Sequence, residues 1–318
     1  MDDAAIELAI KEHRFQDARV GLLQVREYHG KSARNTLMLA ENALKLGDGY
    51  SAERYLTDLE QDEGRTARWA LLSAHARILQ GQPRIAEEIV NGVEAPEPED
   101  GTFEWIRVWA AMEQDRIEEA EEIVDKALRK FPDSALLHGK GAQLSILRGN
   151  WDAADRHIAD ALANDPENYE ALLLRGESFI ARGDTENALE SYREVVRLFP
   201  EFAVPKANVV GLLLDLQQPD LAESELKKAF EDHPQFVLLR FNQARLQAIR
   251  KRWSDARDTM QGIPSDWKKT HPASILLEAE IEAGLGNEAM ARTLYAKLEK
   301  SPDFQERVRE LLAELDSK

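Results

Sequence analysis

Histidines, carboxylates and glycine-rich segments are the residues of this sequence that could carry catalysis, metal binding or phosphate binding. The seven histidines show neither i,i+4 pairing nor the flanking acidic pattern of a zinc site. There is no cysteine and no phosphate-binding glycine loop, since Gly139 and Gly141 flank a lysine inside a predicted helix. The sequence therefore predicts a protein that is not an enzyme and that uses no metal or cofactor.

The charge balance restricts the class of partner. The 318 residues include 41 Lys and Arg against 59 Asp and Glu, a net charge of −18, which disfavours nucleic acid and anionic lipid. No segment approaches the roughly 20 apolar residues of a membrane span, so direct membrane insertion of this chain is not expected. The chain is predicted to be cytoplasmic as given, or periplasmic or envelope-associated if an upstream leader or anchor has been removed.

The elements that must position any functional residue follow from a 34-residue period. Glycines stand 5 residues before the repeated alanines and prolines 12 residues after them, which marks a turn and a helix stop in each unit. Each unit therefore reads as helix, turn, helix and proline stop. The alanines in register are Ala18, Ala52, Ala86, Ala120, Ala154, Ala188, Ala222 and Ala256.

This pattern resembles the tetratricopeptide repeat. Residues 169–202 match the family motif most closely, with Gly176, Ala188, Tyr192 and Pro200 on its marked positions. The resemblance covers nearly the whole chain and implies an all-α fold, a right-handed superhelical solenoid of antiparallel helix pairs.

About nine repeats are expected within residues 1–302, starting near 1, 33, 67, 101, 135, 169, 203, 237 and 272. The last start has slipped by one residue, which we attribute to a loop insertion around Ile263–Trp267. Residues 303–318 place Val308, Leu311 and Leu315 on one face and predict a C-terminal capping helix. The N-terminal end lacks such a cap, which predicts either end-to-end association or, as we favour, removal of an upstream segment.

The family resemblance implies that the first helix of every repeat lines a concave face, with positions 2, 5, 6, 9, 12 and 13 facing the ligand. Transferring that register places Trp105 and Trp109 one helical turn apart on this face, flanked by Leu71, His75 and Lys140. Two interpretations remain open. The tryptophans either anchor a partner peptide or helix, or they are buried by residues of adjacent turns.

The same register adds a second group of candidate residues. Asn208 and Asn242 occupy position 6 of successive repeats, similar to an asparagine ladder that grips an extended peptide, although simple polar lining is the alternative. No repeat has asparagine at position 9, so the carboxylate clamp of chaperone adaptors is absent and a basic or amphipathic partner is expected. The other residues expected in the groove are Gln143, Phe241 and Arg245.

The leading hypothesis is thus a non-enzymatic scaffold that binds a partner peptide or helix in its concave groove. The alternative is a structural component of a cell-envelope assembly or export system. A third hypothesis, the regulatory part of an enzyme, requires activity encoded elsewhere. Homo-oligomerisation through the uncapped N-terminal face is compatible with all three.

Overall fold

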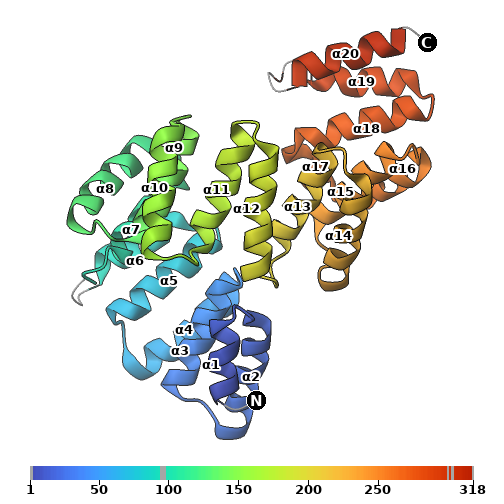
Figure 1. The fold of residues 1–318 in the computed structure, drawn as a ribbon. Helices are drawn as coiled ribbons and strands as arrows, with labels where there is room; N and C mark the ends of the chain where they lie inside the picture. Colours follow the sequence, from blue (N-terminus) through green and yellow to red (C-terminus); the bar gives the residue numbers. More distant parts are fainter. Residues whose placement is uncertain (1–2, 94–97, 299–300, 302–303, 317–318) are drawn as a thin grey trace. The chain divides into compact units, whose positions relative to one another are not determined.

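The structure is a computed structural model that describes residues 3–93, 98–298, 301 and 304–316, and within these residues it contains helices and no strand. The chain divides into two compact units, residues 1–201 (unit 1) and 202–318 (unit 2). Each unit is a stack of helix pairs (Figure 1), so the predicted all-α solenoid is confirmed. None of the described helices has the length and apolar character needed to cross a membrane.

The helices alternate between a first and a second member of each pair. In unit 1 the pairs are α1 (Asp3–Lys11) and α2 (Phe15–His29), α3 (Ala33–Lys45) and α4 (Gly49–Glu63), α5 (Ala67–Leu79) and α6 (Pro83–Gly92), α7 (Thr102–Met112) and α8 (Ile117–Lys130), α9 (Ala135–Leu147) and α10 (Trp151–Asn164), and α11 (Tyr169–Ala181) and α12 (Thr185–Leu198). In unit 2 they are α13 (Ala203–Asp215) and α14 (Pro219–Asp232), α15 (Val237–Ile249) and α16 (Trp253–Gln261), and α18 (Pro272–Gly284) and α19 (Glu288–Leu298).

Side-chain caps and prolines fix where many of these helices begin. The cap oxygen accepts from the backbone N–H three residues later, which satisfies one of the donors that a helix start leaves unpaired. Pro83, Pro219 and Pro272 stand in the first turn of their helices, where no backbone N–H is needed. The side-chain caps are Ser32, Asp48, Thr66, Asn150, Asn168 and Asp184.

The turn between the two helices of a pair has one backbone conformation whatever residue occupies it. The residue five before each repeated alanine has a positive φ. Glycine adopts this left-handed conformation without strain, whereas other L-residues do not. The glycines are Gly47, Gly81, Gly149 and Gly183, and the other residues at this register are His13, Asp115, Gln217 and Lys251.

Small residues make the close helix crossings possible. The eight alanines of the 34-residue register are all fully buried. At the neighbouring register a Cβ on Gly176 would lie 2.7 Å from the Tyr192 ring, so only glycine allows this aromatic ring to fill the space between α11 and α12. The repeated small residues therefore fix packing volume and carry no chemistry.

The one-residue slip near residue 263 has a structural cause that differs from the predicted loop. Residues Ser265–Thr270 form a short additional helix, α17, after an α16 of only 9 residues. The Trp267 ring of α17 stacks on His271 with centroids 3.9 Å apart. After α19, α20 (Gln305–Asp316) buries Val308, Leu311 and Leu315 in a cluster with α19 side chains, as expected for a C-terminal cap.

The first turn of unit 1 contacts the last helix pair of the same unit. His13 Nε2 lies 3.2 Å from a Glu167 carboxylate oxygen, and the His13 ring lies 4.3 Å from that of Phe199. The backbone N–H of Gln16 donates to Glu201 Oε2 at 2.9 Å. These contacts join residues more than 150 positions apart within unit 1.

Candidate functional site

The first helices form the inner layer of each unit. From α3 to α11 in unit 1, and from α13 to α18 in unit 2, each first helix packs against the next first helix, whereas the described second helices make no comparable contact with one another. Because the first helices lie closer together along the stack, their side of each unit is concave. With position 1 at Ala67, Gly101, Ala135 and Tyr169, position 9 in successive repeats of unit 1 is His75, Trp109, Gln143 and Glu177.

Trp105, Trp109 and His75 form one aromatic cluster between α5 and α7. The three ring centroids are each 5.2 Å from one another, and His75 meets Trp105 edge to face at 86°. Trp105 is only 7% exposed, so its ring belongs to the core and cannot serve as an exposed anchor. Trp109 is partly buried, and its indole N–H donates to Glu113 Oε1 at 3.2 Å. Of the two tryptophans, Trp109 therefore offers surface to a partner.

The surroundings of His75 keep its imidazole neutral. Burial against the tryptophans lowers the pKa of His75 to about 4, and the positive charges of Lys45 and Lys140 lower it further in the same direction. At neutral pH the His75 ring is thus an aromatic wall of the cluster that carries no charge. Leu71, one turn earlier on α5, is partly buried and packs against the same core.

Lys140 connects the aromatic cluster to α11. Its ammonium lies 4.6 Å from the Trp109 ring centroid and 2.5 Å from Glu170 Oε1, and it donates to Gln143 Oε1 at 3.3 Å. The Lys140 side chain is 4% exposed, so its charge is satisfied inside the protein by Glu170. Lys140 therefore packs beneath the Trp109 ring as part of the protein interior, where Gln143 accepts one of its hydrogen bonds. Because Glu170 neutralises it, Lys140 offers little of its charge to a partner.

Glu177 is the polar residue of this face that register alone did not single out. It is exposed at position 9 of α11, and among the described residues it has neither an ion-pair nor a hydrogen-bond partner. Desolvation in the concave face raises the pKa of Glu177, and the negative charge of Glu170 raises it further. Glu177 thus presents a carboxylate whose charge the protein leaves uncompensated.

Two apolar side chains complete the inner face of unit 1. Leu147 at the end of α9 is 60% exposed and Ile180 on α11 is 46% exposed. They stand at positions 13 and 12 of neighbouring repeats, beside the position-9 row. The face therefore includes the Trp109 ring, two exposed aliphatic side chains and the Glu177 carboxylate.

The predicted residues of unit 2 are committed to internal contacts. Asn242 is 2% exposed and donates to the Ala207 carbonyl at 2.8 Å, so it is not available as the rung of a ladder. Arg245 donates to Asp215 at 2.5 Å and to Asn242 Oδ1 at 3.4 Å. Phe241 is buried and contacts Trp267, while Asn208 is partly buried. The structure thus brings the unit 1 candidates together, whereas most of the unit 2 candidates are buried or form internal contacts.

Comparisons with known proteins identify the repeat family and support the fold. A sequence model of the tetratricopeptide repeat family matches residues 71–135, 148–201 and 212–268, together more than half of the sequence. The chain belongs to the tetratricopeptide repeat family. A comparison with curated protein sequences found no match. Membership of this family supports a role as a protein-interaction scaffold, because such repeats are in general non-enzymatic and bind proteins.

Solved structures show the same fold at low sequence identity. Pseudomonas aeruginosa pilF is 20% identical with a TM-score of 0.52, covering 66% of this chain and 96% of that one. PilW, described as a widely conserved type IV pilus biogenesis factor, is 19% identical with a TM-score of 0.56, covering 68% and 99%. The APC/C hetero-tetramer Cut9–Hcn1 gives 15% identity and a TM-score of 0.58, covering 91% of this chain and 54% of that one. Similarity at this level establishes the fold.

Proposed function

We propose that the concave face of unit 1 binds a basic, amphipathic segment of a partner protein. The observation that carries the proposal is Glu177, an exposed carboxylate of a desolvated face that no described residue neutralises. A partner cation placed there forms a charge-assisted contact with Glu177. It also offsets the desolvation cost that the charged carboxylate bears in the free protein.

The apolar part of the segment would lie on Trp109, Leu147 and Ile180. An aromatic ring with a rigid support is the usual centre of a binding hot spot, and the buried Trp105 and the partly buried His75 both contact the Trp109 ring. Lys140 and Glu170 neutralise each other beneath this surface, so Glu177 is the carboxylate that a partner cation can reach there. The chain's net charge of −18 adds long-range attraction for a basic partner.

A capture experiment followed by affinity measurement tests the proposal. Proteins retained from the native lysate by the wild-type chain are identified, and the affinity of the tightest is measured against Trp109→Ala and Glu177→Gln. We expect each substitution to weaken binding about tenfold or more, because each removes a central contact. The Glu177→Gln effect should shrink as salt is raised.

The control is Glu190→Gln, an exposed glutamate on the second helix α12 that forms no ion pair or hydrogen bond through its side chain with the described residues. Its affinity should equal that of the wild type. Unchanged affinity of both Trp109→Ala and Glu177→Gln would exclude this face as the binding site.

The alternative, a structural component of a cell-envelope assembly, takes its support from the pilus proteins among the similar structures. Their identity to this chain, 20% and 19%, supports a shared fold and leaves the assembly as a hypothesis. Fractionation of cells that express the complete gene product separates the two: a soluble cytoplasmic protein would exclude the envelope assembly.

A further inference from the structure

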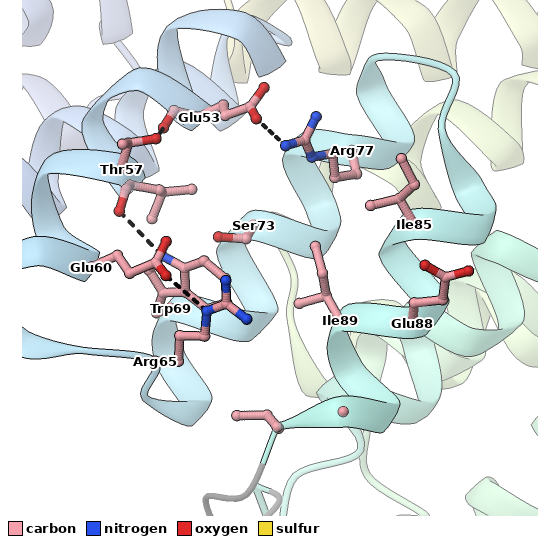
Figure 2. A pocket seen from close by; sticks show the side chains of 13 residues that line it. Glu53, Thr57, Glu60, Arg65, Trp69, Ser73, Arg77, Ile85, Glu88 and Ile89 are labelled. Carbon is pink, nitrogen blue, oxygen red and sulfur yellow. Dashed lines mark hydrogen bonds and ion pairs between the residues drawn. The ribbon is translucent and has the colours of Figure 1, made fainter.

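A pocket of about 380 Å³ opens on unit 1 where the second helices α4 and α6 diverge over the first helix α5. Figure 2 shows α4 forming one wall, α6 the other, and Trp69, Ser73 and Arg77 of α5 lying between them. Its walls belong to the second helices and to the back of α5, whereas the binding face proposed above uses the front of α7, α9 and α11. The two sites therefore share no residue.

The floor of the pocket carries a small polar residue where the preceding repeat has a large apolar one. Leu39, at position 7 of the preceding repeat, is buried, and the same position in the next repeat is Ser73. The backbone around it is otherwise alike. Trp69 donates its indole N–H to the Leu56 carbonyl at 3.1 Å, just as the Asn35 amide donates to the Leu22 carbonyl at 3.1 Å, 34 residues earlier. Serine in place of leucine thus gives the pocket a polar floor.

The hydroxyl of Ser73 is unpaired at that floor. Ser73 is 8% exposed and lines the pocket, and no described residue forms a hydrogen bond with its side chain. The hydroxyl opens onto the pocket, so a ligand or water that enters can supply its hydrogen bond.

The charges around the pocket leave one carboxylate unneutralised. Arg65 lies over the Trp69 ring at 5.1 Å and donates to Glu60 at 2.8 Å, and Arg77 pairs with Glu53 at the other end. Glu88 on the α6 wall is exposed and forms no ion pair with any described residue. The Arg65 contacts show how the pocket holds a guanidinium, between an aromatic ring and a carboxylate.

We propose that this pocket takes a lysine or arginine side chain of a partner protein. The aliphatic stem packs against Trp69, Leu56 and Ile89, and the cationic head reaches Glu88. A donor on the head group also satisfies the Ser73 hydroxyl, which accepts a hydrogen bond. The pocket volume exceeds one such side chain, so neighbouring atoms of the partner backbone enter as well.

The test uses single-residue probes and the indole N–H resonance of Trp69, assigned with a Trp69→Phe variant. Acetyl-arginine methylamide and acetyl-lysine methylamide are titrated against the full chain, with the norleucine and glutamate analogues as neutral and acidic controls. We expect saturable shifts from the two cations with Kd on the order of 10 mM, and at least about tenfold weaker binding of both controls. The ratio of the two cations decides between lysine and arginine.

Two substitutions and one matched control complete the experiment. Ser73→Leu, which restores the residue found at Leu39, should fill the pocket and abolish the shifts. Glu88→Gln should weaken cation binding about tenfold without affecting the fold. Glu190→Gln, at the same repeat position as Glu88, should change nothing.

Equal binding of norleucine and the cations, retained cation binding in Ser73→Leu, or no shift with any probe would each overturn the proposal. None of these outcomes depends on Trp109 or Glu177, so the result is independent of the function proposed for the concave face.

Discussion

The first helices of unit 1 and unit 2 carry polar residues at the same repeat positions, but the two sets are satisfied differently. At position 9, unit 2 has Arg245 bonded to Asp215 and Glu280 bonded to Arg307. Unit 1 has Glu177 at this position, with no partner among the described residues. Register alone therefore identifies a face, and only the contacts of each side chain show whether that face is free to bind.

The largest effect expected from this comparison concerns stability at position 5. Trp105 in unit 1 and Phe241 in unit 2 are both buried at this position. Replacing either with alanine should cost about 3–5 kcal/mol in the free energy of unfolding, because both leave a cavity. Urea unfolding measures the loss in each case.

Trp105→Phe serves as the control, since the indole N–H of Trp105 donates to no described group and no hydrogen bond is lost. Trp109→Ala should cost less than Trp105→Ala, because Trp109 is only partly buried. If Trp109→Ala were the more destabilising of the two, the assignment of core and surface tryptophans would be wrong.

The second effect is a pH dependence specific to unit 1. The pKa of His75 is about 4 in the folded protein against an ordinary value of 6.5, so the unfolded chain binds more protons between these values. The contribution of neutral His75 to the free energy of unfolding is fully present above pH 6.5. It is lost as the pH falls toward 4, by about 3 kcal/mol at 1.36 kcal/mol per pKa unit.

His75→Phe should remove most of this dependence while keeping an aromatic ring against Trp105. His29→Phe, at an exposed position, should not. Unfolding titrations at several pH values compare the three proteins. An unchanged slope in His75→Phe would assign the acid sensitivity to other groups.

A third, smaller effect on stability concerns the left-handed residue in the turn between the two helices of a pair. Unit 1 has four glycines at the left-handed turn position beside His13 and Asp115, and in unit 2 Gln217 and Lys251 adopt the same conformation. Replacing either with glycine should raise the unfolding free energy by about 0.5–1 kcal/mol, because the left-handed strain is relieved. Alanine at the same positions should give no gain, and an equal gain from alanine would show that the backbone conformation is not the cause.

The smallest effect tests the uncompensated charge itself. The raised pKa of Glu177 means that the folded state holds its proton more tightly than the unfolded state, so stability falls as the pH rises above about 4.5. Glu177→Gln should therefore raise the unfolding free energy at pH 7, by less than about 1 kcal/mol for so exposed a group, and should leave it unchanged at pH 3. A substitution that both stabilises the chain and weakens partner binding would mark Glu177 as a binding residue; destabilisation at pH 7 would show that it is structural.

Much of the fold could be read from the sequence, because a 34-residue period of alanine, glycine and proline fixes packing volume, turns and helix ends at once. The short helix α17 could not, since residues 263–267 look like a loop insertion by spacing alone. The site was predicted less well. Trp105 and Trp109 stand one helical turn apart on the same predicted face, and the sequence does not show that Trp105 is buried while Trp109 stays partly exposed.

The contacts of His13 and Gln16 with the sixth helix pair have a consequence for how unit 1 unfolds. A linear array in which each repeat touches only its neighbours has two free ends, and it melts by fraying from them. In unit 1 the first end contacts the sixth pair, so its release breaks contacts at both ends of the stack. We therefore expect amide exchange in α1 and α2 to be coupled to exchange at the end of α12, as in a closed cooperative unit.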